Sequence, residues 1–285
     1  MKALYPEALS NIRAWAKENS RPFTEARNRF AQGAILRAIA SSNWLSRILV
    51  FKGGNALDFV WQPNRSTKDL DFSSIESGLT ADDIQKHLGR ALEQTGRSLG
   101  ISFRIQKIDR QPPGPNRTFV TYQVSVGFAL EDDLNNRDRI ARGDPSKAVI
   151  PIDISLNEPV CGDELVEIHG LARLRVSTVD DIIAEKLRAL LQQPIRKRNR
   201  CQDLLDIAML VRTHPEINHI RIAEYLHRKA HARGVPVSHA AFDNPEVSQL
   251  ARVDYDSLKQ TARTFIPFEE AWLELRALVA QLSLD

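Results

Sequence analysis

Two carboxylates stand one residue apart in the sequence Asp69-Leu70-Asp71. Their alternation with apolar Leu70 and Phe72 predicts a half-buried strand that carries both acids on its open face. Residues i and i+2 of a strand project about 6.6 Å apart, where two carboxylates repel by about 2.5 kcal/mol at an effective dielectric constant of about 20. Mg²⁺ would turn this repulsion into attraction, because it binds carboxylates together with water and substrate phosphates. The alternative is a pair of solvated acids on an exposed strand.

A glycine pair, Gly53-Gly54, follows the apolar run from Ile48 to Phe51 and precedes the apolar-periodic segment NALDFV. This order predicts a strand, a tight turn and a short helix. Glycines at such a place let backbone amides approach phosphate oxygens, and the positive end of a helix adds to the attraction. The alternative is a turn that needs glycine only for its backbone dihedral angles. The glycine pair and the two acids Asp69 and Asp71 together favour phosphate and metal binding more than either feature does alone.

Asp153 is the candidate for a third carboxylate. It lies in the segment AVIPIDISL, whose isoleucines alternate with polar residues and predict another half-buried strand. Its carboxylate would project from the polar face of that strand. The alternative is an ordinary strand acid that points outward.

Lys186 falls inside an apolar arc of a predicted helix, VDDIIAEKLRALL, while Glu185 and Arg188 point away from that arc. A lysine in such an arc either extends its ammonium group to solvent or meets an anion. The arc consists of Val179, Ile182, Ile183, Leu187, Leu190 and Leu191.

Two acids one helical turn apart, Asp203 and Asp206, interrupt the segment QDLLDIAMLV, which is otherwise apolar almost all round. Buried acids need partners. Either nearby arginines of the segment RKRNR hold them in a structural salt-bridge network, or the acids have a catalytic task.

The segment from Lys186 to Arg200 contains six basic residues and no acidic one. It is a solvated loop, a site for nucleotide phosphates or a contact for the backbone of an RNA acceptor. Phosphate contact is favoured because the segment joins the helices that carry Lys186 and Asp206.

The FKGGNALDF and RSTKDLDF segments together resemble the AbiEii/AbiGii branch of the DNA polymerase β-like nucleotidyltransferases, which includes MenT-like toxins. Asn55 stands where that family usually has Ser or Thr, which leaves the role of its side chain at the phosphates open. The matching residues are Lys52, Gly53, Gly54, Ala56, Leu57, Arg65, Thr67, Asp69 and Asp71.

Two further segments resemble blocks of the same family. AEKLRAL is similar to the family's E-K-L block, whose lysine is implied to contact nucleotide phosphates. QDLLD is similar to an R-D-x-x-D-like block, but Gln202 replaces the arginine. We therefore expect Arg198 or Arg200 as the partner of Asp203.

The resemblance implies an enzyme that transfers a nucleotidyl group from an NTP and acts as the toxin of a type IV-like toxin–antitoxin or abortive-infection pair. It implies a two-metal Mg²⁺ site at Asp69, Asp71 and Asp153, with Lys186, Asp203 and Asp206 as further catalytic candidates. The candidate nucleotide-binding residues are Lys52, Gly53, Gly54, Asn55, Arg65, Thr67 and Lys186.

The expected partners follow from the same resemblance. Relatives modify tRNA acceptor ends, so the 3′ end of tRNA is the leading acceptor, and a cognate antitoxin is a candidate partner. The alternatives are transfer to a protein or small molecule, and a module that binds nucleotide without being an enzyme.

The elements that must position these residues suggest an α/β (α+β) fold. We expect a nucleotidyltransferase domain with a mixed sheet at residues 1–175 and a helical domain at 176–285 that completes the NTP site. Periodicity predicts two helices before residue 40 and another at residues 81–99, which Thr80 caps. Further strands are expected at 101–108, 118–128 and 164–169, separated by the loop DRQPPGPNR and a polar stretch at 131–147.

Composition excludes several classes of protein. Of the 285 residues, 42% are hydrophobic and 26% charged, which does not fit disordered, collagen-like or coiled-coil chains. No stretch has the length of a signal peptide or membrane span, so we expect a cytoplasmic protein that does not bind membranes. A net charge of +3 is too small to indicate a nucleic-acid binder by itself.

Cysteines and histidines offer little chemistry in this chain. Cys161 and Cys201 lack the partners of a disulfide scaffold or zinc site and are expected to be passive thiols. His227 and His231 are four residues apart but lack the glutamate of a zinc-binding HExxH helix, so we expect them at the surface.

Overall fold

The computed structural model describes residues 5–114, 117–168 and 172–284. The chain divides into two compact units, which we call the sheet unit and the helical unit. The sheet unit comprises Met1–Val60, Thr67–Asn157 and Glu164–Val176. The helical unit comprises Trp61–Ser66, Glu158–Asp163 and Ser177–Asp285. It therefore includes Arg65, although that residue precedes the acidic strand of the sheet unit.

A mixed sheet, seven-stranded over the described residues, forms the centre of the sheet unit, with strand order β3-β4-β5-β2-β1-β7-β6. β2 pairs in parallel with β5 and antiparallel with β1, which in turn pairs in parallel with β7. This arrangement confirms the expected α/β fold with a mixed sheet. The strands are β1 (Leu49–Lys52), β2 (Leu70–Ser74), β3 (Ile101–Gln111), β4 (Val120–Leu130), β5 (Val149–Leu156), β6 (Asp163–Ile168) and β7 (Ala172–Ser177).

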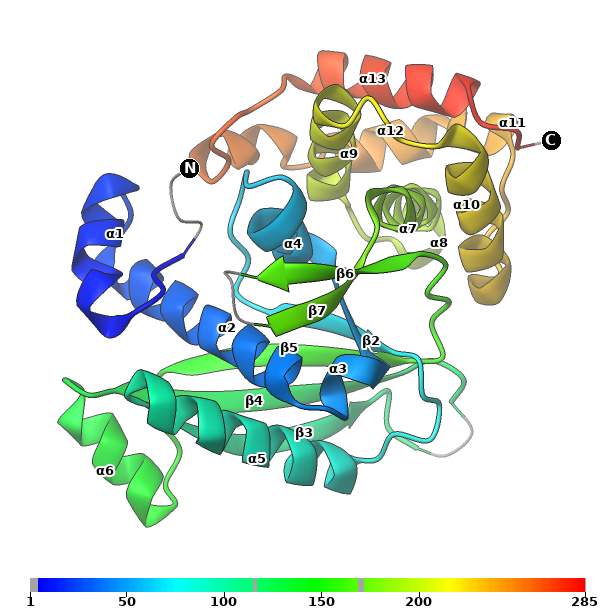
Figure 1. Cartoon of the computed structure of the whole chain (residues 1–285). Helices are drawn as coiled ribbons and strands as arrows, with labels where there is room; N and C mark the ends of the chain where they lie inside the picture. Colours follow the sequence, from blue (N-terminus) through cyan, green and yellow to red (C-terminus); the bar gives the residue numbers. More distant parts are fainter. Residues whose placement is uncertain (1–4, 115–116, 169–171, 285) are drawn as a thin grey trace. The chain divides into compact units, whose positions relative to one another are not determined.

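Helices cover one face of this sheet, where α2 and α5 lie along the strands (Figure 1). The predicted cap of α5 is confirmed, because Thr80 and Asp83 exchange side-chain-to-backbone hydrogen bonds at its start. The helical elements are η1 (Leu9–Asn11), α1 (Ile12–Glu18), α2 (Phe23–Ser41), α3 (Leu45–Ile48), α4 (Gly53–Ala56), the π-helical turn η2 (Leu57–Trp61), α5 (Ala81–Leu99) and α6 (Leu134–Arg142).

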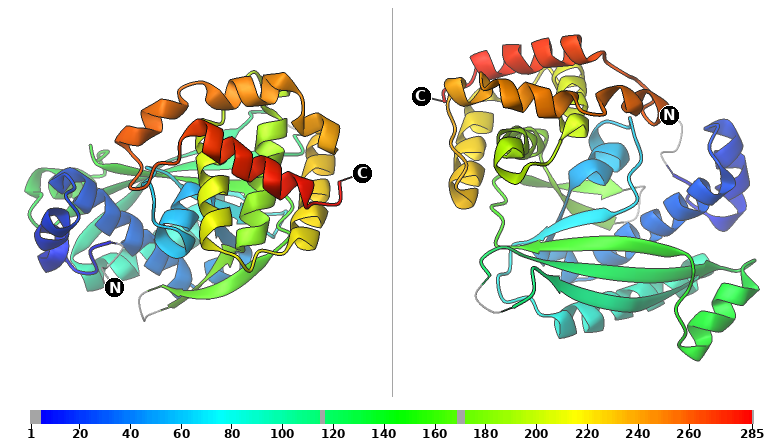
Figure 2. Two further views of the ribbon diagram at one scale, coloured as in Figure 1. Left: turned by 90° about the horizontal axis from the view of Figure 1, so that it is seen from above. Right: turned by 180° about the vertical axis from the view of Figure 1, so that it is seen from behind.

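The helical unit packs α7 against α9 and α10, and α9 against α13 (Figures 1 and 2). Its core contains aliphatic side chains such as Leu187, Leu205 and Leu275 together with the aromatic rings of Phe242 and Tyr255, all buried. The elements are α7 (Val179–Leu191), α8 (Gln193–Arg196), α9 (Cys201–Thr213), α10 (His219–Arg233), α11 (His239–Phe242), α12 (Pro245–Arg252), η3 (Tyr255–Gln260) and α13 (Phe268–Ala280).

Three local predictions need correction. The polar stretch after β4 contains α6, which was not predicted because the segment is mostly polar and none of its residues is buried. The expected loop at 109–117 begins later, since β3 continues to Gln111, and residues 115–116 of that loop lie outside the described residues. The strand β7 was not predicted from the sequence. It pairs in parallel with β1, with Val176 opposite Phe51. None of the described helices has the length and apolar character needed to cross a membrane.

Candidate active site

The predicted acids lie together on the open face of the sheet unit. In the register of the sheet, Asp71 of β2 is opposite both Asp153 of β5 and Lys52 of β1. Gln123 of β4 is opposite Asp153 on its other side. Residues in register on paired strands project to the same face. We call the carboxylates of Asp69, Asp71 and Asp153 the acid row.

Electrostatic repulsion acts within the acid row. The pKa of Asp153 is raised, chiefly because its half-buried carboxyl loses water, and the charge of Asp69 contributes to the rise. A hydrogen bond from Gln123 and the charge of Lys52 act in the opposite direction. Sequence analysis did not identify Gln123, although its polar position in the alternating strand β4 was a usable signal.

The glycine turn brings backbone against the acid row. Gly53 has φ +75°, and a Cβ atom built on it would lie 2.4 Å from Oδ2 of Asp71. Only glycine tolerates both this dihedral angle and this approach. Gly54 follows in α4, a helix of four residues.

The donor chemistry of the acid row fits a divalent metal, because carboxylate oxygens are the ligands that Mg²⁺ prefers. In the part of the chain that the structure describes, no three His, Cys, Asp or Glu side chains are already placed so that they could hold a metal ion. Metal binding at the acid row therefore stays a prediction, and it requires these carboxylates to rotate toward a common point.

The helical unit contains a buried ion network formed by Arg65, Lys186, Asp203 and Asp206. Nζ of Lys186 donates to Oδ1 of Asp203 and to Oδ2 of Asp206, each at 2.7 Å. Arg65 binds the same Asp206 through Nε at 3.1 Å and Nη2 at 2.7 Å. The four side chains are between 4% and 13% exposed.

Two cations and two carboxylates make this buried ion network electrically balanced. Burial opposes ionisation of Asp206, but Lys186 and Arg65 outweigh it and lower the pKa of Asp206 to about 2. Burial likewise opposes the charge of Lys186, yet Asp203 and Asp206 raise its pKa. Lys186 thus meets anions rather than solvent, and these anions belong to the chain.

Two expectations about arginines change with this geometry. Arg200 does contact Asp203, at 3.9 Å, but Lys186 is the closer partner. Arg188, expected to point away from the apolar arc, is 7% exposed and donates to Oε1 of Gln192 at 2.5 Å and to Glu185. Arg188 is thus buried with its two terminal guanidinium nitrogens bound by Gln192 and Glu185.

A family model for the nucleotidyltransferase AbiEii toxins of type IV toxin–antitoxin systems matches residues 34–274. The chain belongs to the AbiEii nucleotidyltransferase toxin family. It is therefore a nucleotidyltransferase toxin of a type IV toxin–antitoxin system, and membership implies an NTP substrate and an antitoxin partner.

Solved structures show the same fold as this AbiEii-family chain. MenT4, the nucleotidyltransferase toxin Rv2826c from Mycobacterium tuberculosis H37Rv, is 17% identical with a TM-score of 0.57, over 97% of this chain and 90% of that one. JHP933 from Helicobacter pylori is 17% identical with a TM-score of 0.51, over 89% of each chain. A comparison with curated protein sequences gave no significant match.

Asn55 has an interior place in the AbiEii-family chain. Its side chain is 0% exposed, its Oδ1 accepts from Arg29, and its Nδ2 donates to the carbonyls of Thr67 and Asp69. Both ends of the amide are thus engaged away from solvent, and contact of Asn55 with nucleotide stays a prediction. Thr67 is half-buried, and its hydroxyl lies 3.5 Å from the carbonyl of Asp69.

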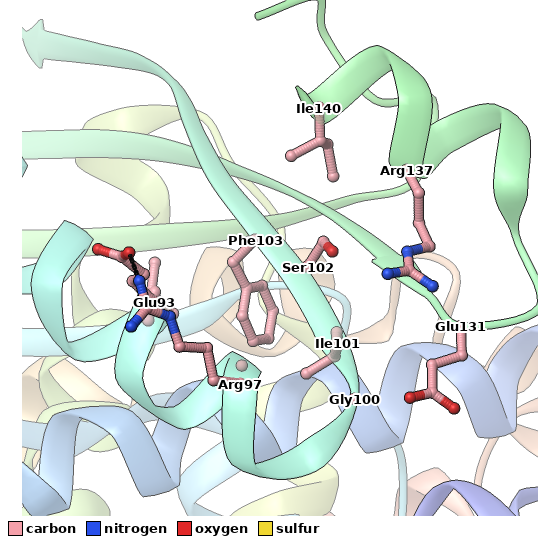
Figure 3. A pocket seen from close by; sticks show the side chains of 11 residues that line it. Glu93, Arg97, Gly100, Ile101, Ser102, Phe103, Glu131, Arg137 and Ile140 are labelled. Carbon is pink, nitrogen blue, oxygen red and sulfur yellow. Dashed lines mark hydrogen bonds and ion pairs between the residues drawn. The ribbon is translucent and has the colours of Figure 1, made fainter. Parts of the chain in front are cut away.

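A cavity of about 400 Å³ lies elsewhere on the sheet unit, where β3 begins and β4 ends (Figure 3). Figure 3 shows Glu93 paired with Arg97 at this cavity, and Arg137 of α6 on the side of Glu131. The residues from Gln123 to the end of β4 span roughly 23 Å, at about 3.3 Å per residue. The cavity is therefore remote from the acid row, and we assign no catalytic role to it.

Histidines and cysteines lie as expected in the AbiEii-family chain. His227 and His231 are exposed, and Cys161 and Cys201 are free thiols. Between the histidines, however, Lys229 is 6% exposed and lies 3.0 Å from Oδ1 of Asp181. Sequence analysis did not identify this buried lysine or its partner on α7.

Proposed function

We propose that this AbiEii-family toxin is a cytoplasmic, Mg²⁺-dependent enzyme that transfers nucleotides from an NTP to the 3′ acceptor end of tRNA. The observation that carries the metal-dependent part is the sheet register, which sets Asp71 beside Asp153 on the open face. The choice of tRNA rests on the family resemblance of the sequence motifs.

The proposed reaction forms a phosphodiester bond between an acceptor hydroxyl and the α-phosphorus of the NTP. The bond between the α- and β-phosphates breaks, pyrophosphate leaves, and the hydroxyl proton passes to solvent. Bound divalent metal would supply Lewis-acid neutralisation of charge on the triphosphate and would acidify the attacking hydroxyl. Asp69, Asp71 and Asp153 are the residues that would hold it.

Other residues of the sheet unit would serve the phosphates. Gly53 and Gly54 lie at the turn that begins α4, where the backbone of Gly53 comes close to Asp71, and we assign their backbone amides to the phosphate oxygens. Lys52 stands in register with Asp71 and adds a positive charge beside the acids. Gln123 orients Asp153 through its hydrogen bond.

The buried ion network of the helical unit has a different task in this proposal. A carboxylate with a pKa of about 2 is a poor proton acceptor at neutral pH, so we assign Asp206 to holding Lys186 and Arg65. Contact of Lys186 or Arg65 with nucleotide phosphates, and completion of the NTP site by residues 176–285, stay predictions.

The direct test is incubation with Mg²⁺, total RNA and each NTP labelled at its α-phosphate. We expect wild-type protein to label tRNA, Asp69→Ala to label nothing, and the exposed control Asp82→Ala to match wild type. Equal labelling by Asp69→Ala and wild type would refute the transferase site. Label on protein or on a small molecule would refute the tRNA acceptor.

Toxicity gives an independent test in cells. Expression of wild-type protein should arrest growth, while Asp71→Ala or Lys186→Ala should relieve the arrest at equal protein level. Arrest by these variants as strong as that of wild type would contradict an enzymatic origin of the toxicity.

A further inference from the structure

Three consecutive backbone carbonyls before β2 accept hydrogen bonds from two buried amides. Nε2 of Gln32 donates to Thr67 at 2.9 Å and to Lys68 at 3.1 Å. Nδ2 of Asn55 donates to Thr67 at 3.1 Å and to Asp69 at 2.5 Å. The two side chains are 2% and 0% exposed, so neither contact competes with water. The backbone that leads to the first acid is therefore fixed from the interior of the sheet unit.

The orientation of the Asn55 amide is itself determined by a charged group. Nη1 of Arg29 lies 3.2 Å from Oδ1 of Asn55, so this oxygen faces a donor and Nδ2 must face the carbonyls. Arg29 is held by Oδ2 of Asp58 at 2.6 Å and stacks over the ring of Phe59 at 3.9 Å. Arg29 and Asp58 are 2% and 1% exposed. A reversed amide would place two oxygen acceptors against each other.

Asp69 depends on these amides more than Asp71 does. The register of β2 with β5 begins at Leu70, and Asp71 lies within the paired strands, opposite Lys52 on one side and Asp153 on the other. Asp69 precedes the ladder, and its carbonyl is bound by the Asn55 amide instead. The place of the Asp69 carboxylate therefore follows from a side-chain clamp rather than from strand pairing.

We infer that Asn55 is a positioning residue for the reaction: its amide, oriented by Arg29, sets the backbone of Asp69 and thereby the first carboxylate of the acid row. The inference rests on the proposed function, in which Asp69 is a metal ligand. It gives Asn55, which stands where Ser or Thr is usual in the family, a role that neither of those shorter side chains could fill toward all of its partners.

The test compares substitutions that each replace a side-chain amide by the corresponding acid, at three different positions of the sheet unit. Asn55→Asp keeps the contact with Arg29 and removes the donor to Thr67 and Asp69. Gln32→Glu removes donors to Thr67 and Lys68 only. The matched control is Gln106→Glu, because Nε2 of Gln106 also donates to a carbonyl of the sheet unit, that of Ser146 at 3.2 Å. Asn55→Ser, a neutral and smaller change, is the second variant should Asn55→Asp fold poorly.

Two measurements on the full chain report on positioning. Titration with Mn²⁺, followed by the electron paramagnetic resonance signal of the free ion, gives metal affinity without catalysis. Hydrogen exchange of peptides that cover residues 65–72 gives the local order of the backbone. Labelling of RNA from NTP is recorded for the same samples.

We expect Asn55→Asp and Asn55→Ser to weaken Mn²⁺ binding by about tenfold or more, the usual effect of removing a group that orients a ligand. Exchange at residues 65–72 should accelerate, while α5 and β4 exchange as in wild type. Gln32→Glu should have a smaller effect and Gln106→Glu none. Ile84→Val, a mild core truncation on α5, controls for loss of stability alone and should leave Mn²⁺ binding unchanged.

The two ways of failing are distinct. If wild type binds Mn²⁺ and labels RNA, and both Asn55 variants do so equally well, the positioning role is overturned and the proposed function stands. The same holds if exchange accelerates but Mn²⁺ affinity does not change, because the clamp would then be structural only. If wild type neither binds Mn²⁺ nor labels RNA, the proposed function fails, and the inference fails with it.

Discussion

Asp153 of the sheet unit and Asp206 of the helical unit are aspartates withdrawn from solvent, yet their pKa values shift in opposite directions. Burial raises the pKa of Asp153, and the neighbouring Asp69 adds to the rise. Burial acts on Asp206 in the same sense, but Lys186 and Arg65 reverse the outcome and lower its pKa to about 2. The first carboxylate lies among like charges, and the second lies between two cations.

This difference separates a site where three carboxylates lie beside one lysine, Lys52, from one where two cations balance two carboxylates. The acid row gains stability when positive charge arrives, which is the property of a site that binds metal and substrate. The buried ion network loses stability when any member is removed, because a charge then remains buried without its partner. Substitutions in the two places should therefore separate activity from stability.

The largest expected effect is on activity in the acid row. Asp71→Asn should lower the rate of nucleotide transfer about 10³-fold, equivalent to ~4 kcal/mol of transition-state stabilisation. The free energy of unfolding, measured in urea, should change by less than about 1 kcal/mol, because the substitution relieves repulsion. Asp82→Asn in the first turn of α5 is the matched control and should leave both quantities unchanged. A large loss of stability in Asp71→Asn would show that the acid row stabilises the fold, as the buried ion network does.

The next effect is on the stability of the helical unit. Lys186→Met should reduce the free energy of unfolding by about 3 kcal/mol or more, because Asp203 and Asp206 lose their shared partner. Lys197→Met removes an exposed ion pair with Glu246 and should cost no more than about 0.5 kcal/mol. Urea denaturation of both variants measures the difference. Equal stability of the two would show that the buried ion network is not needed for the fold.

The pH dependence of stability tests the same network. The pKa of Asp206 is about 2 in the folded chain and ordinarily 3.8, so the folded state binds fewer protons than the unfolded state between these values. The contribution of this group is complete above about pH 4 and is lost as the pH falls through about 2. We expect about 2 kcal/mol more acid destabilisation in wild type than in Asp206→Asn. Parallel profiles of the two proteins would contradict the lowered pKa.

The smallest effect concerns the glycine turn beside the acid row. Gly53→Ala should cost about 1–2 kcal/mol of stability, because φ is +75° there and the methyl group would meet Oδ2 of Asp71. Activity should fall as well, since Asp71 must move. Gly78→Ala, with nothing within 4 Å of its Cβ position, is the control. The measurements are thermal unfolding and the rate of nucleotide transfer. Equal values for the two variants would show that the glycine turn does not position Asp71.

Much of the acid row could be predicted from sequence, because apolar and polar residues alternate along a half-buried strand. Alternation placed Asp71 and Asp153 on the open faces of two strands, and the structure shows those strands paired in register. The partner of Asp206 could not be found in this way, because Arg65 lies 141 positions earlier in the chain. Contacts between residues far apart in the chain form through tertiary packing and give no periodic pattern in the local sequence.

Asn55 shows a second limit of sequence patterns. A polar residue next to a glycine pair is typical of a phosphate site, and only the burial of its side chain among Arg29 and the carbonyls before β2 reveals an interior role. Gln123 was overlooked for the opposite reason, since an exposed glutamine in an alternating strand is unremarkable until its neighbour Asp153 is known.

The most direct test of the central claim is a Mn²⁺ titration of wild type, Asp71→Asn and Asp203→Asn, followed by electron paramagnetic resonance. Asp203 is the most exposed carboxylate of the buried ion network, at 13%, so its substitution is the gentlest change there. We expect wild type and Asp203→Asn to bind Mn²⁺ alike and Asp71→Asn to lose binding. Loss of binding in Asp203→Asn with retention in Asp71→Asn would contradict the assignment of the metal site to the acid row.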